Sequence, residues 1–285
     1  MYVESAKQLL HSNNKTMVIS MRDLNSFSAE FSESIMHGYH RVEPCLNDTL
    51  AAFVKDIDRT QHMQEERGVG RELGEDKYYV AFSNIYPENL RSLKCSLLGT
   101  LICLRATVTR TSEVRPELTM GVFKCKACDQ KSSKIVQHFK FTEPKKCKTV
   151  NCDNNRFELV NEECEFSDYQ KLRVQEDPMV IPPGSMPRSL DVILRNDTVE
   201  KAQPGDICQF FGQLAVVPDI VSMVKPGDRT QVLTKNTENR GNTVGMEGVT
   251  GLKQTGVRDI NYKLVFICNW VEVDNNQFST DNEKK

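Results

Sequence analysis

Four cysteines occur as two close pairs, Cys125-x2-Cys128 and Cys147-x4-Cys152, with eighteen residues between the pairs. Two such pairs, each on a tight turn, can place four thiolates around one tetrahedral ion with Zn–S bonds of about 2.3 Å. Four protein ligands leave no open position for a reacting water, and the spacing therefore predicts one structural Zn²⁺ ion and no catalytic metal. We expect residues 122–156 to fold as a zinc ribbon whose stability depends on the ion.

Redox dithiols and rubredoxin-type iron sites also use C-x-x-C pairs. A thioredoxin-like dithiol requires a βαβ context, which the sequence around Cys125 and Cys128 lacks. Zinc is therefore favoured over both alternatives. The other cysteines are isolated in the sequence and are expected to be buried thiols. They are Cys45, Cys95, Cys103, Cys164, Cys208 and Cys268.

From about Leu98 onward, the sequence contains five short runs that are rich in apolar and β-branched residues. Turn residues separate the runs. They are LLGTLICLRATVTRT, DYQKLRVQE, SLDVILRND, DICQFFGQLAVVPD and YKLVFICNWVEV. Five strands of this kind predict a small closed barrel, formed by residues 98–121 and 157–273. Since both cysteine pairs lie between the first and second runs, the zinc ribbon at 122–156 is an insertion in the barrel.

The regions flanking the barrel have different patterns. Residues 1–97 have helical apolar spacing at Phe27, Phe31 and Ile35 and again from Leu46 to Ile57, which predicts a helical subdomain with a second helix beginning near Asn47. Within it, the charged segment 58–77 is expected to be an exposed loop. Residues 218–260 contain six glycines and predict a long hairpin or extended loop, and 274–285 a polar tail or linker. The predicted fold class is α+β, mainly β.

Charge is distributed unevenly along the chain. Residues 105–148 contain eleven Lys/Arg and four Asp/Glu, a net charge of +7, whereas the remainder of a chain with formal charge −2 carries −9. A Zn²⁺ ion with four thiolates would contribute about −2 and leave this block positive. Such a block can attract a polyanion, although a solvated surface is the alternative interpretation. The sequence has neither a signal-peptide pattern nor an apolar run long enough to span a bilayer, and we expect no membrane partner.

The segment LGTLICLRATVTRTSEVRPELTMGVFKCKAC resembles the N-terminal domain of the minichromosome maintenance (MCM) replicative helicases. The resemblance continues through QKLRVQEDPMVIPPGSMPRSLDVILRNDTVEKAQPGDICQFFGQLAVVPD and GLKQTGVRDINYKLVFICNWV, in register from about Tyr78 to Val273. The segments VTRTSEVRPEL and GSMPRSLDVILR, with the cysteine spacing, are most similar to one subunit type of the eukaryotic heterohexamer.

The resemblance implies a helical subdomain, an OB-fold and a zinc ribbon inserted in it. It also implies assembly with other MCM subunits into a hexameric ring, binding of single- or double-stranded DNA, and location in the nucleus. OB-folds suit this task because an open β face with basic side chains can follow phosphates without reading sequence. The positions that match the family's DNA contacts are Arg110, Arg115, Arg173, Arg195, Lys225 and Arg229, each of which has a surface ion pair as its alternative.

The sequence contains no G-x-x-x-x-G-K-[ST] phosphate loop, and we expect this chain alone to be no ATPase. ATP would bind only the motor domain of the resembled family, and the chain is interpreted as an isolated N-terminal fragment or a truncated gene product. One alternative function is a single-strand DNA-binding protein similar to the large subunit of replication protein A, which also embeds a zinc ribbon in an OB-fold. A protein–protein assembly adaptor is the other.

Overall fold

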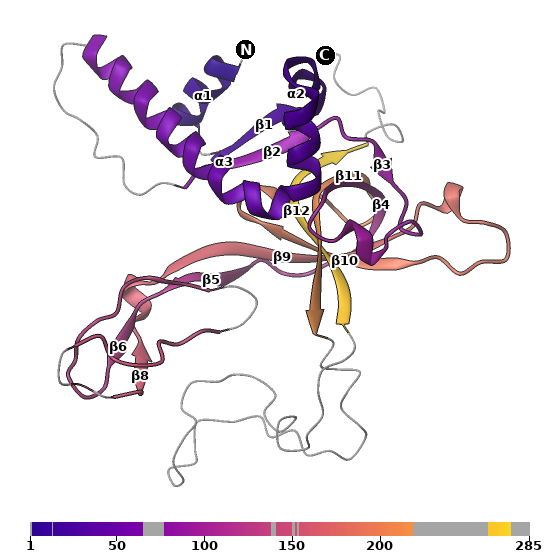
Figure 1. The fold of residues 1–285 in the computed structure, drawn as a ribbon. Helices are drawn as coiled ribbons and strands as arrows, with labels where there is room; N and C mark the ends of the chain where they lie inside the picture. The colour runs from indigo at the N-terminus through magenta and orange to yellow at the C-terminus, as the bar shows by residue number, and fades with distance from the viewer. Residues whose placement is uncertain are drawn as a thin grey trace, which may run out of the picture. The chain divides into compact units, whose positions relative to one another are not determined.

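In a computed structural model of the chain, the structure describes residues 2–12, 14–64, 77–137, 141–149, 152, 154–218 and 262–274. They form a mixed α+β fold, mainly β, that divides into two compact units (Figure 1). The first unit comprises Met1–Arg115, Tyr169–Ala215 and Leu264–Lys285, and the second comprises Pro116–Asp168 and Val216–Lys263. Among the helices in the described ranges, none is long and apolar enough to cross a membrane.

The N-terminal part of the first unit combines helices with a two-stranded parallel sheet. Helices α1 (Tyr2–His11), α2 (Met21–Phe27) and α3 (Ala29–Gln64) accompany strands β1 (Thr16–Ser20) and β2 (Tyr79–Ser83). The strands pair from Thr16 opposite Tyr79 to Ser20 opposite Ser83. The core between helices and strands includes Tyr39 and Phe82, whose rings meet edge to face at 6.1 Å. The sequence predicted these helices, but it did not predict the small sheet.

Helix α3 corrects two sequence expectations. Its backbone is non-helical at Gly38, where two helices join, so the second helix begins before Asn47, whose side-chain oxygen accepts a hydrogen bond from the backbone N–H of Val80 at 2.9 Å. It also includes residues 58–64 of the predicted loop 58–77, because arginine, glutamine and methionine are good helix formers that extend an existing helix; residues 65–76 lie outside the described part. Phe27 and Phe31, whose spacing indicated a helix, are exposed.

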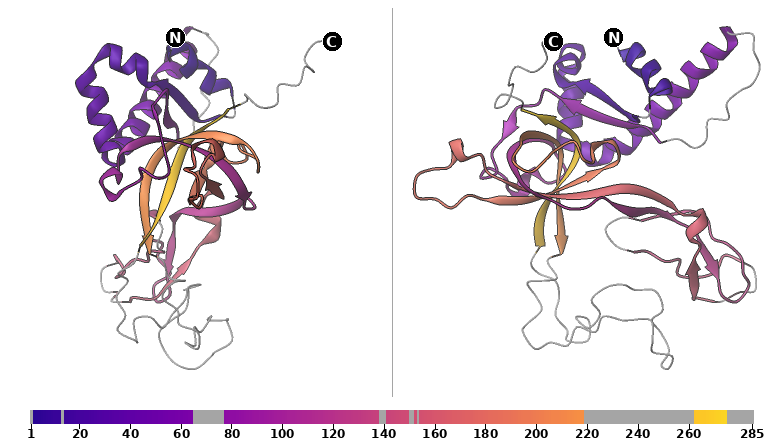
Figure 2. Two further views of the ribbon diagram at one scale, coloured as in Figure 1. Left: turned by 90° about the vertical axis from the view of Figure 1, so that its right-hand side faces the viewer. Right: turned by 180° about the vertical axis from the view of Figure 1, so that it is seen from behind.

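Five strands of the first unit close into a ring. They are β4 (Leu101–Thr111), β11 (Ile207–Pro218), β12 (Tyr262–Val273), β10 (Ser189–Arg195) and β9 (Glu165–Gln175). Hydrogen bonding follows that order, and a further pairing between β9 and β4 completes the circuit (Figures 1 and 2). Each strand coincides with one of the five predicted runs. The short elements beside them are β3 (Pro87–Glu88), η1 (Cys95–Leu97), η3 (Pro178–Val180) and η4 (Asn196–Thr198).

The interior of the ring is apolar because alternate side chains of each strand point inward. Leu172 and Val174 on β9 and Val192 and Leu194 on β10 are completely buried in this cluster. At Gly212 on β11 the backbone of β12 comes so close that an added Cβ would lie 2.0 Å from the carbonyl oxygen of Ile267. Glycine is therefore required at this crossing of strands.

The second unit is small and contains both cysteine pairs. Its elements are β5 (Arg115–Gly121), β6 (Phe123–Cys125), β7 (Ile135–Val136), β8 (Phe157–Leu159) and η2 (Asn161–Glu163). Strand β5 pairs with β7 and β6 with β8, all antiparallel. The compact unit begins and ends outside the predicted insertion 122–156, because β5 and β9 continue into it. The predicted hairpin 218–260 and tail 274–285 fall, apart from Pro218 and Asp274, outside the described residues.

Candidate metal centre and nucleic-acid interface

The first cysteine pair lies on a tight turn at the end of β6. The backbone N–H of Cys125 donates to the carbonyl of Gln130 at 2.9 Å, and the N–H of Asp129 donates to the carbonyl of Cys125 at 3.0 Å. Asp129 adopts a left-handed conformation with φ of 57°, which short polar side chains tolerate. The turn folds the chain back after Cys128, so both thiols lie on the same side of it.

The second pair is held by hydrogen bonds within residues 147–154. The N–H of Cys147 donates to the carbonyl of Asn154 at 3.1 Å, and the N–H of Cys152 donates to that of Thr149 at 3.2 Å. The Cys147 sulfur lies 3.3 Å from the hydroxyl oxygen of Thr149. The two turns lie far apart in the sequence, and each of them presents two thiols.

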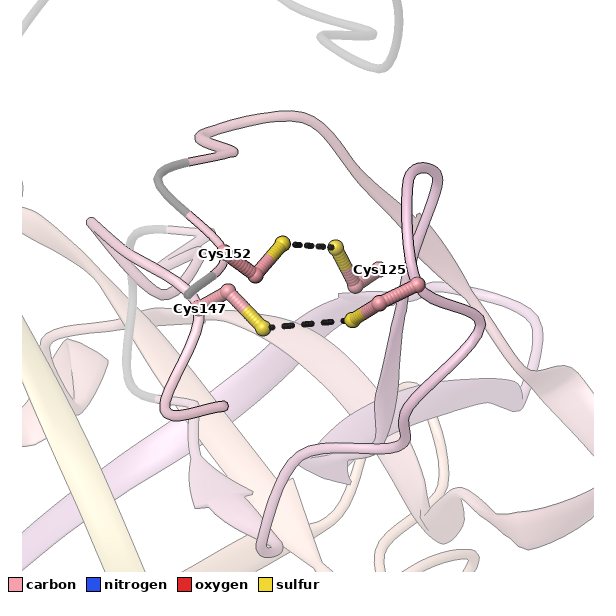
Figure 3. Close-up of side chains that lie close together, drawn as sticks. Cys125, Cys147 and Cys152 are labelled. Carbon is pink, nitrogen blue, oxygen red and sulfur yellow. Dashed lines mark hydrogen bonds between the residues drawn. The ribbon is translucent and has the colours of Figure 1, made fainter. Parts of the chain in front are cut away.

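The four sulfur atoms face one another (Figure 3) and all lie within 4.8 Å. Cys125 Sγ is 3.8 Å from Cys152 Sγ, and Cys128 Sγ is 3.5 Å from Cys147 Sγ. A tetrahedron with Zn–S bonds of about 2.3 Å has edges of about 3.8 Å. This spacing fits one tetrahedral ion, and an all-thiolate donor set selects zinc or iron over magnesium or calcium. The predicted residues therefore do converge, and they can hold a metal ion.

The thiols of this cluster differ in acidity. The side-chain amide of Asn154 donates to Cys125 Sγ at 3.2 Å and, as the largest cause, lowers the pKa of that thiol to about 6. The Thr149 hydroxyl lowers the pKa of Cys147. Asn154 is a supporting residue that the cysteine spacing alone did not indicate. Hydrogen bonds to sulfur favour the thiolate, which is the form that binds a metal.

The lysines of the second unit are paired more than the sequence predicted. Lys124 lies 3.1 Å from Asp129, Lys134 lies 2.8 Å from Glu165, and Lys131 contacts Glu163. Two of these partners come from beyond the basic block, which is why counting charge within residues 105–148 overstated the free positive charge. These lysines are therefore partly neutralised within the unit.

Arg110 and Arg115 both expose their side chains. Arg110 lies near the end of β4, and Arg115 begins β5 with a side chain that is 76% exposed. Its guanidinium is 3.9 Å from the carboxylate of Glu113, which is itself exposed. An exposed ion pair at this distance contributes little energy. Both side chains remain available to an anion.

Arg173 and Arg195 are more committed to the protein. Arg173 on β9 contacts the buried carboxylate of Asp191 at 2.5 Å. Arg195 is half-buried at the end of β10. Burial raises the pKa of the Glu43 carboxyl, and the positive charge of Arg195 acts in the opposite direction and lowers it. Arg173 thus forms the ion pair that was the alternative to a DNA contact at this position. Lys225 and Arg229 lie outside the described residues.

The six isolated cysteines differ in burial, and Cys164 is intermediate. Cys103, Cys208 and Cys268 are buried, as predicted, and burial raises the pKa of Cys103 and of Cys208 to about 12. Cys45 and Cys95 are exposed, which contradicts the expectation. Within the described part of the chain, the four-cysteine cluster is the one group of cysteines and other ligating side chains arranged to hold a metal ion.

The fold and the site define an α+β protein with a strand ring and a cysteine cluster suited to a metal ion. Residues 1–92 match the model of the MCM N-terminal domain, and residues 89–218 match that of the MCM OB domain. The chain belongs to the MCM family and contains both of these domains.

Curated relatives with similar sequences share one subunit type. It is 36% identical over 283 residues to the DNA replication licensing factor MCM6 of Arabidopsis thaliana, which covers 99% of this chain and 33% of the relative. It is 36% identical to mcm6 of Dictyostelium discoideum, over 100% of this chain and 33% of the relative, and 37% identical to mcm6 of Schizosaccharomyces pombe, over 96% and 31%. By name these relatives are the sixth subunit, which is the subunit type that the segments VTRTSEVRPEL and GSMPRSLDVILR and the cysteine spacing indicated. The chain spans about a third of the length of these relatives.

Proposed function

We propose that this chain is the DNA-binding and ring-assembly region of an MCM replicative helicase subunit. The observation that carries the proposal is the match of residues 1–218 to both MCM domain models. It would act in the nucleus, in the initiation of DNA replication and in unwinding at the fork. ATP hydrolysis would belong to a motor domain of the full-length family member, for which this chain lacks the phosphate-loop motif.

Two structural assignments belong to this proposal. The closed strand ring would be the OB-fold barrel, and the four-cysteine unit would be a zinc ribbon inserted between β4 and β9. Cys125, Cys128, Cys147 and Cys152 would hold one structural Zn²⁺ ion per chain, supported by sulfur separations of 3.5 and 3.8 Å. Bound zinc would supply the unit with folding energy and no reaction chemistry.

For DNA contact, exposure favours Arg110 and Arg115 over Arg173 and Arg195. Both side chains are open to solvent, whereas Arg173 already contacts Asp191. Contacts to phosphates would position a single strand without reading its sequence. Arg195, Lys225 and Arg229 remain proposed contacts. Other MCM subunits would be the protein partners, in a hexameric ring.

A binding measurement with a matched control tests the DNA part of the proposal. We expect a labelled oligothymidylate to bind the chain with a salt dependence that becomes shallower by about 0.7 in log–log slope for each contact removed, in R110Q and in R115Q. Arg59 on α3 is an exposed arginine that is also loosely paired with a carboxylate, and R59Q should leave the slope unchanged. Equal effects of R59Q and R110Q would contradict a defined site.

Zinc content and native mass test the remaining parts. One zinc per chain, lost in C128S, is expected by inductively coupled plasma mass spectrometry. Native mass spectrometry with other MCM subunits should show this chain in a hexamer. Assembly without any DNA binding would favour the protein–protein adaptor, whereas DNA binding by a chain that joins no MCM ring would favour the single-strand-binding alternative.

A further inference from the structure

Charged side chains form a row across three strands on the outer face of the ring. Arg110 on β4 lies opposite Arg173 on β9, and Arg173 lies opposite Asp191 on β10. Lys171 shares this face with Arg173, because side chains two residues apart on a strand point the same way. The intervening residue, Leu172, is buried in the ring core. The register thus brings three cations and one carboxylate together on this face.

Asp191 holds the two cations of β9 unequally. Its carboxylate contacts Arg173 Nη1 at 2.5 Å and Lys171 Nζ at 3.0 Å, although its side chain is only 4% exposed. Arg173 is fixed a second time, because its Nη2 donates to the Ser189 hydroxyl at 2.5 Å. A guanidinium bonded through two nitrogens is well oriented, whereas a lysine held by one contact is readily displaced.

The row has more positive charge than Asp191 can neutralise. Arg110 is exposed, and the structure gives it no ion pair within the described residues. Like charges directly opposite each other on paired strands destabilise a sheet, and Arg110 faces Arg173 in this way. The three cations Arg110, Lys171 and Arg173 and the carboxylate of Asp191 sum to a charge of +2. A polyanion bound there would relieve the repulsion.

We propose that Lys171 and Arg110 form a phosphate-binding pair for single-stranded DNA, with Asp191 as its internal counter-ion. Asp191 fixes Arg173 and competes with the DNA phosphate for Lys171, which sets the affinity of this face. Arg173 is then a positioning residue that keeps Asp191 in place. This inference rests on the proposed DNA binding and adds Lys171, which the sequence did not indicate.

Substituting Asp191 and Lys171 singly and together tests the inference with the same oligothymidylate. K171Q should weaken binding and make the salt slope shallower by about 0.7, as R110Q does. D191N should tighten binding several-fold and steepen the slope, because an asparagine oxygen can still accept from Arg173 while its NH₂ group cannot accept from Lys171. In the double variant the gain from D191N should disappear.

Asp168 provides the matched control for the change in net charge. It is exposed on β9 and lies an odd number of residues from Lys171, so its side chain points to the other side of the strand. D168N should change neither affinity nor slope. Tighter binding by D168N and D191N alike, weaker binding by D191N, or an unchanged slope in K171Q would each overturn the inference.

Folding and binding failures are separable in this design. Thermal denaturation shows whether D191N is folded; if it is not, K171Q alone decides, because an exposed lysine is not needed for folding. A wild-type chain that does not bind DNA removes both the proposed function and this inference. A wild-type chain that binds and responds to R110Q but not to K171Q removes this inference only.

Discussion

The first unit buries two clusters of apolar side chains, one of seventeen residues inside the strand ring and one of eleven between the helices and β1–β2. The described part of the second unit buries three such side chains, those of Val122, Phe123 and Cys125. A unit with so little buried apolar surface requires another source of stability. The four-cysteine cluster lies in this unit, and the comparison teaches that packing holds the first unit, whereas the second is expected to depend on a metal ion that its cysteines can hold.

Removing the ion should have the largest effect and should be confined to the second unit. We expect C128S, or a strong chelator, to remove stabilisation on the order of 10 kcal/mol from the second unit, because metal binding and folding are coupled there. Limited proteolysis should then cut within residues 116–168. Trp270, the chain's single tryptophan, lies on β12 in the first unit. Denaturation followed by its fluorescence should therefore keep the same midpoint. Loss of both signals together would show that the units do not differ in this way.

The converse experiment removes packing from the first unit. Phe210 on β11 is completely buried in the ring core, and F210A should lower the free energy of unfolding by about 3–5 kcal/mol because it leaves a cavity. Urea denaturation followed by Trp270 fluorescence measures this loss, and the zinc content should be unchanged. F141A, at a half-exposed ring of the second unit that meets Phe123 edge to face, is the control and should leave the Trp270 midpoint in place.

Lowering the pH should reveal an electrostatic contribution to the stability of the first unit that is smaller than the contribution of its packing. Arg91 donates to the carboxylate of Glu176 at 2.7 Å and lowers its pKa. The stabilisation is therefore present above the pKa of about 4.3 of an unfolded-chain glutamate and is lost as the pH falls through the lower pKa of the folded state. E176Q should reduce stability at pH 7 and flatten its dependence on pH below about 4.3, measured by Trp270 fluorescence. An unchanged acid profile would count against this pair.

Much of this protein followed from local sequence. The five ring strands coincide with five apolar, β-branched runs, because such runs favour a pleated, half-buried surface wherever they occur. The cysteine cluster followed from spacing, since each pair needs only a tight turn to place its two thiols together. The start of the second helix in α3, which follows Gly38, was misplaced at Asn47 because polar asparagine and aspartate resemble a helix start, while Asn47 instead contacts β2.

The tertiary structure decided which charges meet. Lys171 and Asp191 are twenty positions apart, and Arg110 is further still from both, so no periodicity connects them; strand register alone places them in one row. The same reason explains why β1 and β2, separated by α2 and α3, were not foreseen as a pair. Sequence by itself determined the strands and the cysteine cluster, which depend on neighbours along the chain. Folding determined the partners of the arginines, because contacts between distant residues exist only once the sheet has closed.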